Sequence, residues 1–300
     1  MSIHIKLILM ALMWGGGFVS GKVIAQLAGP FTVSFLRFVM TSAVLGVIVR
    51  HQKTPVRLTR TLAAYIFAAS FIGMVCYNYL FFSGIRLIDA GRGAVIISTV
   101  PVVVAVLSFV IFKERLSVIN FLGIVLSLAG AWVVITRGEI GSFVAGGFGR
   151  GEIYLVLCVL CATTFTMTSK KALEVLSPLV VTLVIAIDGA AMMLVPAAIE
   201  VHQQGLITSG VFWGNLMYLA LGPSVVAVIW YYEAIQTVGA SRASQYMNLM
   251  PVFAVVLAMM FLHERITFSL LTGAALVCAG LYCTNVNPSK KKEPQAVYVE

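Results

Sequence analysis

Ten apolar runs, each about twenty residues long, follow one another along almost the whole chain. About 20 consecutive apolar residues in a helix are enough to cross the hydrocarbon core of a bilayer. The sequence therefore predicts an all-α membrane protein with ten transmembrane helices and no soluble domain between them. The expected helices cover residues 5–25, 32–50, 61–82, 90–111, 118–136, 152–170, 178–199, 211–235, 240–261 and 267–285.

The composition agrees with a lipid environment. Of the 300 residues, 60% are hydrophobic and only 10% are charged, whereas a soluble domain is about 45–50% apolar and about 25% charged. The net charge of +9 does not indicate a nucleic-acid partner, because the basic residues lie in short clusters between the apolar runs. The expected partners are the lipid bilayer and a small-molecule substrate.

The distribution of Lys and Arg predicts the orientation in the membrane, because cytoplasmic connections carry an excess of these residues. With the N-terminus in the cytoplasm, the inner segments hold thirteen of them and the outer loops five. Both termini are therefore expected in the cytoplasm. The inner set is Lys6, Arg50, Lys53, Arg57, Arg60, Lys113, Arg115, Lys170, Lys171, Arg242 and Lys290–Lys292, and the outer set is Arg86, Arg92, Arg137, Arg150 and Arg265.

The second half of the chain repeats the pattern of the first. With a shift of 150 residues, the segment 90–92 falls on 240–242, Pro101 falls on Pro251, and the segment 113–117 falls on 263–267. Five helices per copy is an odd number, so the copies would cross the membrane in opposite directions, as in many secondary transporters. We expect a first repeat over 1–137, a connecting loop over 138–151, a second repeat over 152–287 and a disordered basic tail over 288–300.

The order and spacing of these segments resemble the drug/metabolite transporter (DMT) superfamily, and in particular its EamA-type exporters. The resemblance extends over about residues 5–285. It implies a carrier of the bacterial inner membrane that exports small metabolites, often amino acids or drug-like compounds, through a central cavity between two halves. The matching pieces are Trp14-Gly15, Lys22, Arg37-Phe38, Ala90 to Pro101, Glu114-Arg115 and Glu264-Arg265.

Four ionisable side chains within the runs are candidates for the transport pathway, because a charge at the bilayer centre costs about 2.5–3.5 kcal/mol on insertion scales. Asp188 is the deepest acid, and it either couples transport to protons, balances a bound ammonium, or pairs structurally with Arg37 or a backbone group. Glu233 is either a pathway residue or an interfacial carboxylate. Lys22 and Arg37 are either pathway residues or side chains that reach toward the interface.

Two stripes of polar residues at helical spacing are further candidates. A polar stripe in hydrocarbon must face protein or water, so these residues either line a cavity or bond neighbouring helices. The stripes are Ser241, Ser244, Gln245 and Asn248 in the run 240–261, and Ser70, Gly73, Tyr77 and Asn78 in the run 61–82. The aromatic cluster 230–232 either stacks a substrate or belongs to the interfacial aromatic belt.

Helix-breaking residues fall near the middle of three runs. Pro101 and Pro251 each remove a backbone hydrogen bond and kink the helix, and Gly222-Pro223 interrupts the run 211–235 at the position that aligns with Gly73. These residues are expected to act either as hinges for alternating access or as static kinks that shape the bundle.

Motifs of enzymes and ATP-driven pumps do not occur in the sequence. There is no Walker motif, no H-E-x-x-H and no G-x-S-x-G, and the pair Cys158 and Cys161 has no second metal-ligand pair. We therefore expect no enzyme activity, no cofactor and no metal. The predicted function is export of a small metabolite by alternating access, with proton coupling as a hypothesis. A passive channel or facilitator and a non-transporting membrane sensor remain as alternatives.

Overall fold

The structure is a computed structural model that describes residues 1–55, 58–112, 117–137, 149–205 and 207–286. These residues form helices and the turns between them, and they contain no strand. Nine helical segments of the described chain are long and apolar enough to cross a membrane, and α15 (Phe268–Val286) contains a shorter tenth one. The prediction of an all-helical membrane protein is confirmed, and the ten predicted crossings correspond to these nine segments and the shorter tenth one.

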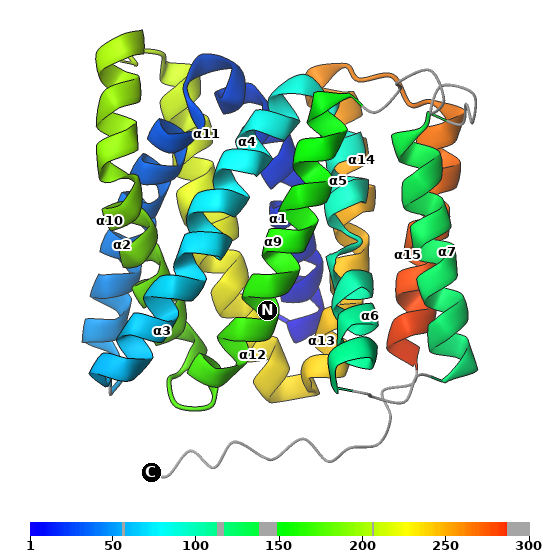
Figure 1. Ribbon diagram of the computed structural model, residues 1–300, viewed down its shortest axis with the longest axis horizontal. Coiled ribbons are helices and arrows are strands. Elements are labelled where there is room, and N and C mark those ends of the chain that lie inside the picture. Colours follow the sequence, from blue (N-terminus) through cyan, green and yellow to red (C-terminus); the bar gives the residue numbers. More distant parts are fainter. Residues whose placement is uncertain (56–57, 113–116, 138–148, 206, 287–300) are drawn as a thin grey trace.

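The helices stand side by side and run between a lower and an upper face in the view of Figure 1. The lower face carries the ends of α2, α9 and α12, and the upper face carries the ends of α1, α4 and α14. The first half of the chain contains α1 (Ile3–Leu27), α2 (Pro30–His51), α3 (Arg60–Ser70), α4 (Tyr77–Leu87), α5 (Ala90–Ile97), α6 (Val100–Phe112) and α7 (Val118–Ile135). The second half contains α9 (Arg150–Leu173), α10 (Pro178–Gln204), α11 (Gly210–Leu221), α12 (Ala227–Val238), α13 (Ala240–Gln245), α14 (Met250–Leu262) and α15.

Four of the crossings are interrupted near their middles. A π-helical segment, Phe71–Cys76, separates α3 from α4, and another, Gly222–Val226, separates α11 from α12. A turn at 98–99 separates α5 from α6, and a 3₁₀ segment, Tyr246–Leu249, separates α13 from α14. The last two breaks come directly before Pro101 and Pro251, because proline has no N–H to continue the helical ladder. Gly222 begins the second π segment, so the sequence located three of the four breaks directly.

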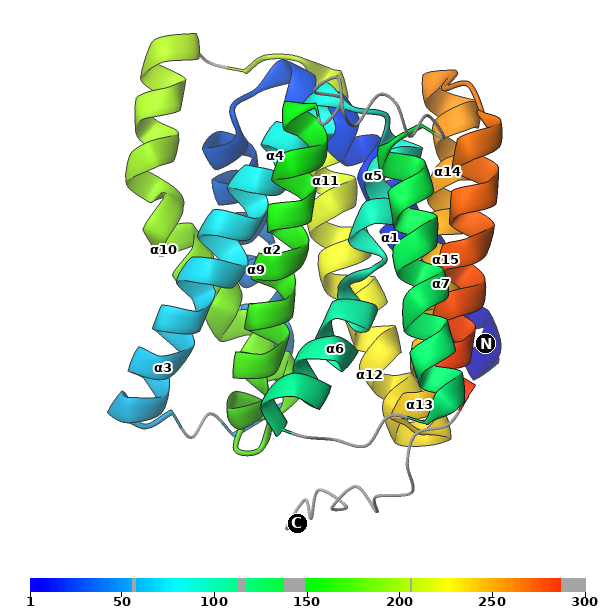
Figure 2. The ribbon, with the colours of Figure 1, turned by 45° about the vertical axis from the view of Figure 1, so that its right-hand side comes forward.

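The crossings pair closely along the bundle. The α7 helix packs along α15, α2 packs along α10, α1 packs against α14, and α4 packs against α9 (Figure 2). Glycines permit the closest of these approaches, since a Cβ atom added at Gly130 in α7 would lie 2.6 Å from the carbonyl oxygen of Gly273 in α15. Ser127 also donates a hydrogen bond to the carbonyl of Val277 across the same interface, at 3.3 Å.

The last crossing of each half begins with a side-chain N-cap. The Ser117 hydroxyl accepts a hydrogen bond from the N–H of Asn120 at the start of α7, and the Thr267 hydroxyl accepts one from the N–H of Leu270 at the start of α15. Such caps satisfy backbone donors that have no partner within the helix. The segment 113–116, with Glu114 and Arg115, and the basic tail lie outside the described residues.

Replacement of Gly130 by alanine tests the close packing of α7 against α15. We expect Gly130→Ala to lower the melting temperature, because the added methyl group meets backbone atoms and overpacking costs about 1–3 kcal/mol. Gly46→Ala in α2 is the control, since nothing lies within 4 Å of its added Cβ and alanine favours helix. Equal shifts of the two melting temperatures, measured in the same detergent, would contradict the packing described.

Candidate functional site

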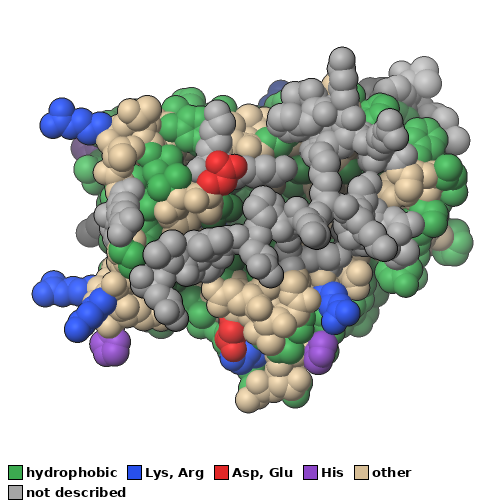
Figure 3. Space-filling view, turned by 90° about the horizontal axis from the view of Figure 1, so that it is seen from below, with side chains coloured by type: hydrophobic (Ala, Val, Ile, Leu, Met, Phe, Trp, Pro, Cys, Tyr) green, Lys and Arg blue, Asp and Glu red, His purple; other side chains and the backbone are tan. Residues whose placement is uncertain are grey.

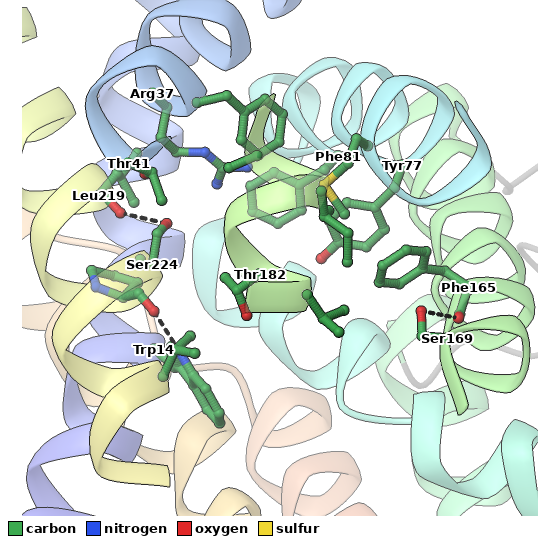
Figure 4. Close-up of a pocket in the computed structure, with 18 of the residues that line it drawn as sticks. Trp14, Arg37, Thr41, Tyr77, Phe81, Phe165, Ser169, Thr182, Leu219 and Ser224 are labelled. Carbon is green, nitrogen blue, oxygen red and sulfur yellow. Dashed lines mark hydrogen bonds between the residues drawn. The ribbon is translucent and has the colours of Figure 1, made fainter. Parts of the chain in front are cut away.

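A cavity of about 410 Å³ lies in the middle of the bundle, enclosed mainly by α1, α2, α4, α9, α10 and α12 (Figure 4). A neighbouring cavity of about 360 Å³ shares seven of its lining residues, so the two are treated as one region, the central cavity. Its walls are mostly apolar and aromatic. The shared residues are Trp14, Arg37, Met74, Tyr77, Ile97, Phe165 and Met250.

The helix interruptions border this cavity, and side chains bond backbone carbonyl groups within them. The indole N–H of Trp14 donates to the carbonyl of Pro223 at 3.0 Å, and the Asn78 amide donates to the carbonyl of Met74 at 2.7 Å. Irregular backbone at membrane depth is tolerated where it is bonded within the protein or lines a cavity. The breaks therefore give the cavity polar backbone without leaving these carbonyl groups unpaired.

Arg37 carries the one charge among the described residues that line the central cavity. Its Nη2 donates to the Asn78 side-chain oxygen at 2.6 Å, and its guanidinium lies 4.8 Å from the centroid of the neighbouring Phe38 ring and 5.8 Å from that of Phe82. Its buried Nε has no hydrogen-bond partner. Arg37 and Tyr77 extend into the cavity from opposite sides (Figure 4).

The deepest acid predicted from the sequence does not pair with this arginine. Asp188 accepts a hydrogen bond from the Ser70 hydroxyl at 3.2 Å, where α10 passes α3, and it is not among the residues that line the central cavity. The structural alternative of an Asp188–Arg37 pair is therefore not the one observed in the described chain.

Glu233 lies near the lower face and forms an ion pair with Lys6 at 2.5 Å, with 44% of the Glu233 side chain exposed. It also lines a smaller cavity of about 300 Å³, together with Gln52 and Tyr232. Tyr232 lines the central cavity as well. The central cavity therefore borders a second cavity on the side of the lower face.

The other candidates are divided between the cavity wall and the rest of the bundle. Lys22 donates to the carbonyl groups of Arg86 and Ile88, at 3.2 and 2.7 Å, at the end of α4 near the upper face. Ser244 and Gln245 lie in α13, and neither they nor Gly222 and Pro251 are among the described residues that line the central cavity. The candidates that do line it are Arg37, Gly73, Tyr77, Asn78, Pro101, Pro223, Tyr232 and Asn248.

A buried ion pair ties the upper ends of three helices together. Arg92 in α5 lies 3.2 Å from the carboxylate of Glu152 in α9, with 7% and 5% of the two side chains exposed. Arg92 also donates to the carbonyl groups of Val134 and Ile135 at the end of α7. The sequence analysis counted Arg92 among the basic residues of the outer loops and did not identify Glu152 as its buried partner.

The connection between α14 and α15 also bonds the upper end of α5. The carboxylate of Glu264 accepts hydrogen bonds from the N–H groups of Ala90 and Gly91, at 2.6 and 3.1 Å. Burial raises the pKa of this carboxyl above its ordinary value, although the two N–H donors act in the opposite direction. The largest cluster of buried apolar side chains, which includes Phe82, Ile85 and Leu155, lies toward the upper face of the bundle. The upper side of the cavity is thus closed by apolar packing and polar bonds.

Comparison with known proteins identifies the family. A model of the EamA-like transporter family matches residues 1–136 and 149–286. The chain belongs to the EamA-like transporter family. An uncharacterized transporter of Bacillus subtilis (strain 168), YyaM, is 25% identical to it over 94% of this chain and 92% of that protein. An uncharacterized transporter of Archaeoglobus fulgidus is 23% identical over 93% of this chain and 96% of that protein.

A solved crystal structure shares the fold of this EamA-like chain. The two superpose with a TM-score of 0.66 at 17% sequence identity, over 94% of this chain and 97% of that one. The resemblance to the EamA-type transporters is confirmed, and the chain is a multi-pass membrane protein of a transporter family.

Several cavity residues of this EamA-like protein were not identified from the sequence. Phe165, Ser169 and Thr182 line the central cavity. The first two lie in a stretch, 163–169, that is rich in Thr and Ser, and this signal was not used in the sequence analysis. Tyr232 was grouped with an aromatic cluster that either stacks a substrate or lies in the interfacial belt, and it lines the cavity instead of facing lipid.

Substitutions in the buried pair test how the upper end of this EamA-like bundle is stabilised. We expect Glu152→Gln to destabilise the protein by about 3–5 kcal/mol, because it leaves the Arg92 charge buried without a counter-charge. The double variant Arg92→Leu/Glu152→Leu should lose less free energy of unfolding than the sum of the losses in Arg92→Leu and Glu152→Leu. Glu233→Gln, in the half-exposed pair with Lys6, should cost about 0–1 kcal/mol. Additive effects at Arg92 and Glu152 in thermal unfolding would show that the pair is not coupled.

Proposed function

We propose that the protein is a secondary transporter of the bacterial inner membrane that exports a small metabolite by alternating access through the central cavity. The observation that carries the proposal is a small-molecule-sized cavity at mid-membrane depth, bordered by interrupted helices of both halves of the chain. Transporter sites are typically built from such discontinuous helices near the bilayer midplane. The printed names of the relatives, which call them transporters, support the same function.

The proposal includes two inverted repeats, over 1–137 and 152–287. The positions of the helix breaks support it, since the π segments 71–76 and 222–226 lie about 150 residues apart, as do the breaks at 98–99 and 246–249. The contact of α1 with α14 in one repeat arrangement would then correspond to the contacts of α9 with α5 and α6 in the other. The contact of α4 with α9 would likewise correspond to the contacts of α11 and α12 with α1. The pairs α2·α10 and α7·α15 would lie on the symmetry axis.

The proposed orientation places the lower face in the cytoplasm. Lys and Arg side chains lie around the rim of that face (Figure 3), as expected for a cytoplasmic surface. The described basic residues there are Lys6, Arg50, Lys53, Arg60 and Arg242. The second cavity beside the central one would then lie on the cytoplasmic side, which is the side from which an exporter binds its substrate.

A bulky side chain in the cavity wall tests whether solutes pass through it. In proteoliposomes preloaded with a mixture of metabolites, we expect saturable counterflow by the unmodified protein and its loss in Ser169→Trp, which fills the cavity. Leu160→Trp is the control on the same helix, because Leu160 is 48% exposed on the outer surface of the bundle. Non-saturating flux would instead indicate a channel, and flux unaffected by Ser169→Trp would show that the path lies elsewhere.

Proton coupling is a separate part of the proposal and rests on Asp188, whose carboxylate bonds Ser70 between α10 and α3. We expect Asp188→Asn to flatten the pH dependence of counterflow, because an amide of the same shape cannot bind or release a proton. Ser70→Ala keeps the carboxylate and should keep a pH dependence. An unchanged pH profile in Asp188→Asn would remove this residue from the mechanism and leave a facilitator.

A further inference from the structure

We propose that the central cavity binds a small organic anion with an apolar body, such as an aryl- or alkyl-carboxylate, with the Arg37 guanidinium as its electrostatic anchor. This assignment rests on the proposed carrier function and names the class of substrate that it would move. The observations that carry it are the charge balance of the cavity, the unused donors of Arg37 and the chemistry of the surrounding wall.

The charge balance of the cavity is positive. Arg37 is the one charged residue among the described residues that line it, and those residues include no Asp or Glu. The two acids that the sequence suggested for the pathway are bonded elsewhere, Asp188 to Ser70 and Glu233 to Lys6. A guanidinium keeps its charge in proteins, and an isolated charge in a medium of low dielectric constant is costly until a counter-charge pairs with it. An anionic ligand supplies that counter-charge, whereas an ammonium would be repelled.

The hydrogen-bonding donors of Arg37 are largely unused. A guanidinium carries five N–H donors in a planar fork. One bond, from Nη2 to the Asn78 oxygen, is present, while the buried Nε has no partner. Asn78 is itself held by its bond to the carbonyl of Met74, so the bond to Asn78 fixes the direction of the guanidinium. Planar carboxylate and phosphate groups match such a fork with two parallel hydrogen bonds.

The wall around the charge is apolar and aromatic. Phe38 and Phe82 lie beside the guanidinium, and the rings of Tyr77 and Phe165 lie across the cavity from it (Figure 4). Such a wall gains free energy from an apolar or aromatic ligand body and offers little to a strongly hydrated one. A cavity of about 410 Å³ suits a small molecule. The combined features favour an amphipathic carboxylate over inorganic phosphate or a polyol.

Among the described residues, the positive charge in the central cavity comes from the first half of the chain alone. The residue 148 positions after Arg37 is Ile185, which lines the same cavity from α10. An anion would therefore lie toward the α2 side, with its apolar body directed toward α9 and α10. This asymmetry predicts one preferred orientation of the ligand in the cavity.

A matched series of ligands tests the assignment in the purified full-length protein at neutral pH. The probes are 3-phenylpropionate, its neutral amide, phenylethylamine and L-phenylalanine, which adds an ammonium group to the first. Binding is followed by the fluorescence change on titration, since Trp14 lines the cavity. We expect 3-phenylpropionate to bind about tenfold to a hundredfold more tightly than the amide, as a charge-assisted hydrogen bond allows, and more tightly than the amine or the zwitterion.

Variants of the anchor assign the preference to Arg37. In Arg37→Gln the preference for the carboxylate over the amide should vanish, and in Arg37→Lys it should be retained but weakened, because lysine lacks the planar fork. Measurements on the unmodified protein alone can overturn the assignment, if the carboxylate and the amide bind equally or if neither binds. A preference that survives in a folded Arg37→Gln protein would also overturn it.

Counterflow of the same probes in proteoliposomes separates this assignment from the carrier function. Selective binding of the carboxylate without counterflow would refute the carrier and leave the anion site in place. Saturable counterflow of the amide or the amine in preference to the carboxylate would refute the anion site and leave the carrier in place.

Discussion

Backbone hydrogen bonding in hydrocarbon is the constraint on which the rest of the structure depends. Every N–H and C=O at membrane depth needs a partner within the protein, which restricts the chain to helices. Four crossings nevertheless break near their middles, and side chains bond backbone carbonyl groups there, as Trp14 does for Pro223 and Asn78 does for Met74. These bonded breaks surround the central cavity, so the same feature that interrupts the helices gives the interior its polar groups.

The bundle is stabilised differently at its two faces. Near the upper face, the buried pair of Arg92 with Glu152 and the bonds from Glu264 to α5 connect elements far apart in the sequence. Near the lower face, the described ion pair of Lys6 with Glu233 is partly exposed and contributes less. Alternating access in the proposed carrier would require the upper contacts to open, and the residues that form them are not among the described residues that line the central cavity.

Much of the fold follows from the sequence, because the bilayer sets the length and polarity of each crossing. The ten apolar runs, and the breaks before Pro101 and Pro251, are local features that spacing alone reveals. The site was harder to predict, since its geometry depends on contacts between distant helices. Arg37 was found because a charge within an apolar run is conspicuous. The partner of Asp188 was not found, because Ser70 is 118 residues away and sequence spacing does not predict a hydrogen bond between helices so far apart in the chain.

The most direct test of this account is a structure of the full-length protein in a lipid nanodisc with 3-phenylpropionate bound. We expect density for the ligand in the central cavity, with its carboxylate within hydrogen-bonding distance of the Arg37 guanidinium and its ring among the aromatic residues of α4 and α9. Density at another site, or a ligand in the cavity with its carboxylate directed away from Arg37, would contradict it.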